Sequence, residues 1–358
     1  MPGMQAVIVA GGLGSRLRPL TDRRPKHVLP VAGRPFLAHQ LTRLAAAGVE
    51  QVVLATSYRA TELRSELGDG DRFGLEVTYA HEPTPLGTGG AVRHALGELG
   101  GDGADPVIVL NGDQLSDHDL RGQVEQLDHT GADVCLHVVV VADPRAYGCV
   151  PTDDRGRVIA FREKSPDPVS RQVNAGSYVF RRHVIAGIPT GVEVSLEHET
   201  FPRLLRDGHL LVGYRDDGYW LDVGTPAALV RASSDLVRGL VRSPALPDPP
   251  GERLVHPAAR VHPGARVVGG AAVGPGAVVG DGAFVDGSAL MASSVVEPGA
   301  TVVASALGPG ARVGAHSIVR DSVLGDGAGL GARCELAGGV RIGCDVQIPD
   351  GGVRFSAA

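Results

Sequence analysis

Cysteine and aromatic residues are scarce in this 358-residue sequence, which has four Cys and 4% Phe, Trp and Tyr. The cysteines are far apart and form neither a Cys-x-x-Cys pair nor short loops, which excludes a disulfide framework and favours a reduced, cytoplasmic setting. The net charge is −6, and the basic residues form no stripe along the sequence. Few aromatic side chains are present for base stacking, so a nucleic-acid partner is disfavoured. The longest mostly apolar run, residues 134–142, is far shorter than the ~20 residues that span a bilayer, so no membrane segment is expected.

Strand and helix patterns alternate in the first part of the chain. They predict strands at 6–10, 51–56, 75–80 and 107–110, and helices at 35–47 and 89–99. This order is typical of an α/β domain with a Rossmann-like, mostly parallel sheet. Ligands of such sheets bind at the carboxyl ends of the strands, so the loops after Ala10, Ala80 and Leu110 are expected to converge on one crevice.

A proline-rich stretch divides the chain, in agreement with the two domains that its length favours. It follows a predicted helix at 226–238 and cannot continue that helix. The expected organisation is a catalytic domain at 1–240, a linker at 241–253, a repeat domain at 254–352 and a tail at 353–358.

The repeat domain is defined by aliphatic residues at a fixed spacing. They recur every six positions from Val255 to Met291 and then, with slips to five-residue steps, continue to Ile348. This period predicts a hexapeptide, left-handed parallel β-helix of about five coils. A glycine-rich disordered tail is the alternative, but such tails lack a sustained apolar period.

An apolar strand near the N-terminus runs directly into a glycine-rich loop that ends in basic residues. Gly11, Gly12 and Gly14 have no Cβ, so the loop can bring backbone N–H groups against phosphate oxygens, and Arg16 and Lys26 add positive charge. The third glycine of the dinucleotide fingerprint is missing, and no Gly-Lys-Ser/Thr forms a P-loop. The loop therefore indicates a nucleoside triphosphate site of another kind.

These motifs resemble the sugar-nucleotide pyrophosphorylases, especially guanylyltransferases of the GDP-mannose type that are joined to a β-helix. The family signature Gly-Gly-x-Gly-Thr-Arg-Leu-x-Pro-Leu-Thr with Pro-Lys-Pro corresponds to residues 11–21 and 25–27, with departures at Ser15 and His27. Ser15 keeps a hydroxyl, and a surface or packing role is expected for His27. Further matches follow in the family's order at residues 85–90, 111–113, 161–164, 173–176 and 218–226.

The resemblance implies that a phosphate oxygen of a sugar 1-phosphate attacks the α-phosphorus of a nucleoside triphosphate and that pyrophosphate leaves in line. Such a transfer needs positioning and cations that face the spreading negative charge. By resemblance Arg16, Lys26 and Asp113 are catalytic, with Arg16 on the departing pyrophosphate and Lys26 on the α-phosphate. Asp113 and Asp222 are expected to share one Mg²⁺, although singly each fits an ordinary turn or strand end.

Two further groups of residues are implied to hold the substrates. The nucleotide group is Gly11, Gly12, Gly14, Ser15, Glu82, Gly87 and Thr88. The sugar-phosphate group is Gly148, Glu163, Lys164, Asn174 and Gly176. Within the second, Glu163 would accept hydrogen bonds from ring hydroxyls and Lys164 would neutralise the phosphate, although such a pair is ordinarily a solvated surface.

Glu82 is predicted to select the nucleotide base. It aligns where thymidylyl relatives carry a glutamine. A carboxylate offers only acceptors, which suits the adjacent N1–H and amino donors of guanine and repels the carbonyl oxygens of uracil or thymine. The expected substrates are therefore GTP and a hexose 1-phosphate, with mannose 1-phosphate favoured. Glucose 1-phosphate, a heptose 1-phosphate or the cyclitol valienol 1-phosphate stays open as acceptor, as does another nucleotide.

Two other functions are weighed against this one. A bifunctional acyltransferase would need a catalytic histidine in the β-helix, where His256, His262 and His316 are better explained as turn or surface residues. A non-catalytic regulatory subunit would not need the complete set of cations and carboxylates. The β-helix is expected to serve regulation or the contacts of a homo-oligomer.

Overall fold

The computed structural model describes residues 3–354 apart from 57–58, 83, 101–104 and 165, so the end of the predicted tail, 355–358, lies outside the described residues. The chain forms two compact units. Unit 1 contains Met1–Gly12 and Gln40–Trp220, and unit 2 contains Leu13–His39 and Leu221–Ala358. The segment 13–39, which carries most of the signature, thus groups with the C-terminal part of the chain. The linear domain boundaries expected from the sequence stay predictions.

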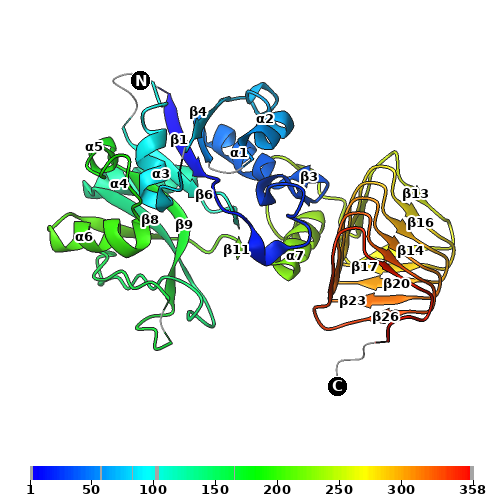
Figure 1. Cartoon of the computed structure of the whole chain (residues 1–358). Helices are drawn as coiled ribbons and strands as arrows, with labels where there is room; N and C mark the ends of the chain where they lie inside the picture. The colour runs from blue at the N-terminus through cyan, green and yellow to red at the C-terminus, as the bar shows by residue number, and fades with distance from the viewer. Residues whose placement is uncertain (1–2, 57–58, 83, 101–104, 165, 355–358) are drawn as a thin grey trace. The chain divides into compact units, whose positions relative to one another are not determined.

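Unit 1 is built on a seven-stranded sheet with the order β10-β8-β9-β6-β1-β4-β5. Figure 1 labels its strands β8, β9, β6, β1 and β4. Strand β1 pairs in parallel with β4 and β6, β4 with β5, and β8 with β10, whereas β9 is antiparallel to both neighbours. The predicted Rossmann-like, mostly parallel sheet is confirmed. The strands are β1 (Met4–Val9), β4 (Val49–Thr56), β5 (Glu76–His81), β6 (Val107–Asn111), β8 (Val134–Val140), β9 (Gln172–Phe180) and β10 (Leu211–Arg215).

The helices follow the predicted pattern with small shifts at their ends. The predicted helix at 35–47 is α1 (Phe36–Ala47), and the one at 89–99 is α3 (Gly87–Ala95), which gives way to tight turns after Leu96. The other helical segments near the sheet are α2 (Ala60–Leu67), η3 (Asp71–Phe73), α4 (Leu120–Thr130), α5 (Arg182–Ala186), η4 (Leu196–Thr200) and α6 (Phe201–Arg206). Two further short strands are β7 (Gln114–Ser116) and β11 (Trp220–Asp222).

The parallel register places the carboxyl ends of the central strands at one edge of the sheet. Val9 at the end of β1 lies opposite Ala55 of β4 and Asn111 of β6. Thr56 lies opposite His81 in the same way. The loops after these strands therefore leave from the same edge, as the sequence predicts.

In unit 2 the N-terminal segment is short and irregular, and α7 leads into the repeats. The segment contains η1 (Ser15–Leu17), η2 (Lys26–Val28) and the hairpin of β2 (Pro30–Val31) and β3 (Arg34–Pro35). The predicted helix at 226–238 is α7 (Pro226–Val237), which Thr225 begins by accepting a hydrogen bond from the Ala228 N–H at 3.2 Å. Pro226 at the first helical position fits this start.

Three parallel sheets form the β-helix. The first stacks β12 (Arg253–Val255), β15 (Ala271–Val273), β18 (Ala289–Leu290), β21 (Ala306–Leu307), β24 (Val323–Leu324) and β27 (Arg341–Ile342). The second stacks β13 (Arg260–Val261), β16 (Val278–Val279), β19 (Val295–Val296), β22 (Arg312–Val313), β25 (Gly329–Leu330) and β28 (Gln347–Ile348). The third stacks β14 (Arg266–Val268), β17 (Phe284–Asp286), β20 (Thr301–Val303), β23 (Ile318–Arg320) and β26 (Glu335–Leu336). The predicted parallel β-helix is confirmed, with between five and six coils.

One predicted anchor of the repeat is wrong. Leu290, not Met291, belongs to the apolar core of the β-helix, although Met291 is also buried. The five-residue step therefore falls between Val285 and Leu290, and each later short step has the same place in the coil. Buried serines fill these shorter turns: the Ser305 N–H donates to Ser288 Oγ and the Ser322 N–H to Ser305 Oγ, both at 3.1 Å.

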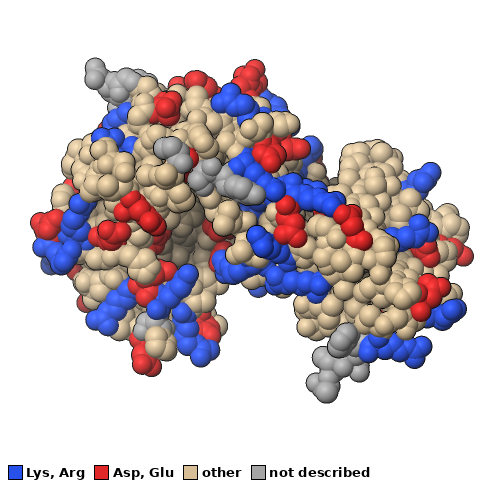
Figure 2. Space-filling model, in the orientation of Figure 1, with Lys and Arg blue, Asp and Glu red and all other residues tan. Residues whose placement is uncertain are grey.

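Among the described residues, no helix is both long and apolar enough to cross a membrane. The cysteines are free, three of them buried and Cys344 partly exposed. Acidic and basic side chains are interspersed over the face drawn in Figure 2.

Candidate active site

The predicted site residues are divided between the two units. In unit 1 the glycine-rich loop begins at the end of β1, where the Ala10 N–H donates to Ala55 O at 2.8 Å and the Gly112 N–H donates to Val9 O at 2.9 Å. Gly11 and Gly12 thus follow the strand directly beside the β6 loop that carries Asp113. The parallel sheet brings these two loops together because β1 and β6 are neighbours.

The end of β6 lies against Gly176 of β9. Gly176 has φ of +73°, and a Cβ there would lie 2.9 Å from both Asn111 Nδ2 and Gln114 Cγ. Its N–H donates to Asn174 Oδ1 at 3.1 Å. The structure therefore brings together Asn174, Gly176 and the residues on either side of Asp113, and glycine is required at this approach by both its φ and the lack of space.

Two amide oxygens at this place are candidates that the sequence analysis did not select. Asn111 Oδ1 and Gln114 Oε1 are buried, and neither has a hydrogen-bond partner among the residues that the structure describes. Buried polar atoms are normally paired, so two such acceptors beside Gly176 fit hydrogen-bond donors of a ligand. The Asn111-Gly112-Asp113 motif was the signal that pointed here, but it gave no reason to select the asparagine.

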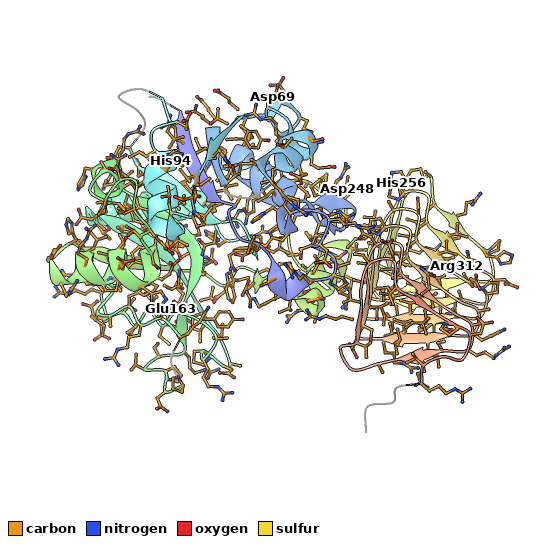
Figure 3. All side chains as sticks on the ribbon, in the orientation of Figure 1. Asp69, His94, Glu163, Asp248, His256 and Arg312 are labelled. Atoms are coloured by element: carbon orange, nitrogen blue, oxygen red, sulfur yellow. The ribbon has the colours of Figure 1, made fainter. Side chains whose placement is uncertain are left out.

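Gly148, Glu163 and Asn174 form the other part of the sugar-phosphate group. The Asn174 N–H donates to Gly148 O at 2.8 Å, and a Cβ on Gly148 would lie 2.5 Å from Glu163 Oε2. Figure 3 labels Glu163, which the chain places between β8 and β9. Glycine at 148 therefore leaves space for the Glu163 carboxylate. Gly148 is thus a neighbour of both Glu163 and Asn174, the other two predicted members of this group.

Lys164 is exposed and has a left-handed backbone with φ of +23°. Its Nζ lies 3.7 Å from Glu163 Oε1. Partial burial raises the pKa of Glu163, and the Glu197 carboxylate raises it further, while Lys164 opposes the shift. A phosphate near Lys164 would meet this cation at the surface of unit 1.

Asn174 continues into a hydrogen-bonded network that the sequence analysis missed. Asn174 Nδ2 donates to the Tyr178 hydroxyl at 2.7 Å, and that hydroxyl donates to Glu197 Oε1 at 3.4 Å. Burial raises the pKa of Tyr178 well above its usual range, and Glu197 adds to the shift, so Tyr178 keeps its proton. Thr88 Oγ1 donates to Glu197 Oε2 at 2.6 Å. One carboxylate thus joins Asn174 of the sugar-phosphate group to Thr88 of the nucleotide group.

Glu197 had only a weak signal in the sequence. It lies in η4, which Ser195 begins by accepting hydrogen bonds from the Glu197 and His198 N–H groups at 3.1 and 3.0 Å. A serine before an acidic helical turn is an ordinary capping pattern. Its contact with Thr88, more than a hundred residues earlier, depends on the tertiary fold.

Gly87 and Glu82 have structural roles besides the predicted ones. A Cβ on Gly87, whose φ is +68°, would lie 2.6 Å from Val194 O, so this glycine allows α3 to approach the segment before η4. Glu82 is buried, and its Oε2 accepts a hydrogen bond from the Leu86 N–H at 3.0 Å. Glu82 therefore holds the turn that leads to α3, and its predicted contact with a base stays a prediction.

Unit 2 contains two basic residues of the signature segment, Arg16 and Lys26, and the carboxylate of Asp222. Gly14 has φ of +64°, and a Cβ there would lie 3.0 Å from Lys26 Cβ, so the glycine lies directly against the lysine. Arg16 Nη2 lies 4.0 Å from Asp222 Oδ2. The Arg16 side chain is 64% exposed and that of Asp222 21% exposed, which leaves both accessible to a ligand. Ser15, between Gly14 and Arg16, begins the short helix η1.

His27, the departure from the signature beside Lys26, is buried. Of the two roles expected for it, this burial favours packing over the surface. In the β-helix, His256 and His262 each accept a hydrogen bond at Nδ1 from the N–H two residues later, at 3.1 Å. These two histidines hold turns, as expected.

The fold is an α/β domain with a mostly parallel sheet, joined to a parallel β-helix. The sequence matches the Nucleotidyl transferase family over residues 5–239. It is 50% identical over 355 residues to a mannose-1-phosphate guanylyltransferase of Mycobacterium tuberculosis, covering 99% of this chain and 98% of that one. The catalytic subunit beta of the Drosophila melanogaster enzyme is 36% identical over 72% of this chain and 71% of its own.

Solved structures agree with this assignment. HddC from Yersinia pseudotuberculosis is 28% identical with a TM-score of 0.57, covering 65% of this chain and 99% of that one. A putative glucose-1-phosphate thymidylyltransferase from Bacillus anthracis is 26% identical with a TM-score of 0.59, covering 64% of this chain and 94% of that one. The chain belongs to the nucleotidyl transferase family and is a nucleotidyltransferase, as the resemblance predicts.

Proposed function

We propose that this protein is a guanylyltransferase that makes a GDP-sugar and pyrophosphate from GTP and mannose 1-phosphate. The observation that carries the proposal is the 50% identity over nearly the whole chain to a relative named for that reaction. HddC, one of the structural relatives, has also been solved in complex with GMP-PN. The carboxylate of Glu82, which offers only hydrogen-bond acceptors, supports a guanine base.

In the proposed reaction the α-phosphorus of GTP gains a bond to a phosphate oxygen of the sugar 1-phosphate and loses its bond to pyrophosphate. Arg16 and Lys26 neutralise the negative charge that moves to the leaving group, and the N–H groups of the glycine-rich loop hold the phosphates. Lys164 binds the phosphate of the acceptor, while Glu163 and Asn174 orient its hydroxyls. The chain thus contributes position and charge and forms no covalent intermediate.

The proposed metal ligands, Asp113 and Asp222, belong to different units. The chain passes between the two units at Gly12–Leu13, at His39–Gln40 and at Trp220–Leu221, so Asp222 is only two residues from unit 1 along the chain. Trp220 itself is fixed by a hydrogen bond from its Nε1 to Ala175 O, at 2.9 Å, next to Asn174 and Gly176. The proposal that Asp113 and Asp222 serve the same reaction therefore rests on the resemblance of the motifs that carry them.

Mg²⁺ is the proposed cofactor. Carboxylate oxygens are the donors that this ion prefers, and it commonly completes its coordination with substrate phosphates and water. No group of three His, Cys, Asp or Glu side chains suited to a metal is present in the described part of the chain. Two carboxylates together with triphosphate oxygens fit that observation. When bound, the ion would neutralise phosphate charge in the transition state.

Pyrophosphate release across a matrix of substrates tests the proposal. GTP, ATP, UTP and dTTP are each combined with mannose, glucose, heptose and valienol 1-phosphates in the presence of Mg²⁺. We expect the highest kcat/KM for GTP with mannose 1-phosphate. A higher value for another pair would replace the proposed substrates, and no release with any pair would overturn the enzymatic proposal. Formation of a homo-oligomer through the β-helix is a separate prediction, which light scattering of the full chain tests.

A further inference from the structure

The last coils of the β-helix contact the backbone of the signature segment. Arg341, at the start of β27, donates from Nη1 to Arg16 O at 2.8 Å and to Arg18 O at 3.1 Å. Cys344 Sγ lies 3.6 Å from Pro19 O. One guanidinium thus fixes two carbonyl groups on either side of Leu17, in the segment whose side chains are proposed to bind the triphosphate.

Two ion pairs extend the same contact. Arg24 Nη1 and Nη2 bind Asp326 Oδ1 and Oδ2 at 3.0 and 2.5 Å, and the Asp326 side chain is only 7% exposed. Arg23 forms a more exposed pair with Asp345. A bidentate pair around a mostly buried carboxylate is stronger and more directional than a surface pair, so Arg24 with Asp326 sets the orientation of the segment before Lys26.

The β-helix provides a rigid base for these contacts. Arg341 lies in a strand that pairs in parallel with β24, Val323 lying opposite it, and Asp326 follows β24 in the next turn. The Gly325 N–H donates to Ile342 O at 2.9 Å, which ties the two coils together beside both residues. Because each coil of a solenoid is held by its neighbours, the position of Arg341 depends on the regular stacking below it.

We infer that Arg341 and Asp326 are positioning residues for the nucleotide: through the backbone at 16–18 and through Arg24 they hold Arg16 and Lys26 in the geometry that binds the triphosphate. This inference rests on the proposed function of the signature segment. It gives the β-helix a direct part in the transferase reaction. Neither residue touches a substrate, so each acts only through the segment that it holds.

The consequence is specific to one substrate. Loss of Arg341 frees the backbone of Arg16 without changing Glu163, Lys164 or Asn174, which lie in unit 1. We therefore expect a raised KM for GTP and an unchanged KM for the sugar 1-phosphate. A general loss of folding would instead lower the amount of active enzyme and affect both substrates alike.

The experiment compares Arg341→Ala, Arg341→Lys and Asp326→Asn with the control Arg312→Ala. Arg312, labelled in Figure 3, is also an exposed β-helix arginine, but it forms an ion pair with Glu297 within the β-helix. We expect Arg341→Ala and Asp326→Asn to lower kcat/KM for GTP about tenfold, the size of one or two lost charge-assisted hydrogen bonds. Arg341→Lys should recover part of this loss, and Arg312→Ala should change nothing.

Binding of Mg²⁺·GTP without a sugar phosphate, measured by calorimetry on the full chain, separates the possible failures. If the parent and Arg341→Ala bind GTP equally, or if Arg312→Ala weakens binding as much as Arg341→Ala, the inference is overturned. If the parent prefers another nucleotide, the same comparison is made with that nucleotide and the base assignment alone fails. If the parent binds nucleotide but releases no pyrophosphate, the proposed function fails, while weaker binding by Arg341→Ala still supports the inference.

Discussion

The cores of the two units are built from different side chains. In unit 1 the aromatic rings of Phe161, Tyr178, Phe180 and Phe201 pack together, with centroid distances from Phe201 of 5.0 to 5.9 Å. The core of the β-helix consists almost entirely of Val, Ala and Leu, repeated coil upon coil. The first core depends on a few large side chains from distant segments, whereas the second depends on many small, equivalent ones.

This contrast predicts unequal costs of truncation. Phe201→Ala removes a fully buried ring and should lower the free energy of unfolding by about 4 kcal/mol, whereas Val302→Ala, also fully buried, should cost about 2 kcal/mol. Urea unfolding of both variants measures the difference. The single tryptophan, Trp220, lies in unit 1, so its fluorescence reports on that unit, and the sheet signal in circular dichroism reports on both.

We expect Phe201→Ala to shift the fluorescence transition strongly, and Val302→Ala to shift the circular dichroism transition more than the fluorescence. Equal shifts of both signals in both variants would show that the units unfold as one, and the contrast between their cores would then have no energetic consequence.

A buried histidine gives unit 2 a pH dependence. His39 is contacted by Ser243 Oγ at Nδ1 and by Val31 O at Nε2, at 2.7 and 3.0 Å, and burial lowers its pKa to about 4. The unfolded chain, with a pKa near 6.5, binds this proton first as the pH falls, so stability is full above about pH 6.5 and is lost toward pH 4. The loss should reach about 3 kcal/mol.

The variant His39→Gln tests this assignment in chemical unfolding at several pH values. Its stability should fall less steeply than that of the parent between about pH 6.5 and 4. His129→Gln, which replaces an exposed histidine, serves as the control. Burial also lowers the pKa values of His118 and His137 in unit 1. These two histidines should cause the pH dependence of stability that remains in the variant. An unchanged slope in His39→Gln would assign the whole effect to that pair.

Each unit supplies one of the two proposed metal ligands, and their substitution tests whether they act together. Asp113→Asn and Asp222→Asn should each lower kcat about a hundredfold and raise the Mg²⁺ concentration that gives half-maximal pyrophosphate release. If they share one ion, the double variant should be little worse than either single variant. Losses that multiply would indicate separate roles, and Asp217→Asn, an exposed carboxylate, should be nearly silent.

The repetitive unit was the more predictable from sequence. Its strands lie where the six-residue period placed them, because each coil meets the same environment as the one before. The error at Met291 arose because Leu290 and Met291 are both apolar and the period alone does not show where the short turn falls. The serine at each short turn, Ser288, Ser305 and Ser322, was the missing signal.

In the first part of the chain β1, β4, β5, β6, α1 and α3 followed from local patterns, but β8, β9, β10 and the site network were not predicted. Tyr178 lies in a strand and Glu197 in a capped turn, and both have ordinary local explanations. Only the fold places the Glu197 carboxylate against Thr88 and Tyr178. Likewise, nothing in the spacing of Arg341 and Asp326 connects them to the signature segment more than 300 residues earlier.

The smallest expected effect concerns recognition of the base by Glu82, which also has a structural role. In Glu82→Gln the amide oxygen can still accept the hydrogen bond from the Leu86 N–H, so the turn before α3 should persist. The amide also presents a donor where guanine presents donors, so kcat/KM with GTP should fall about tenfold and the ratio of GTP to UTP use should fall with it. Glu76→Gln, an exposed glutamate at the other end of β5, is the matched control. If Glu82→Gln uses GTP as well as the parent does, Glu82 only holds the turn, and the choice of base lies with other residues.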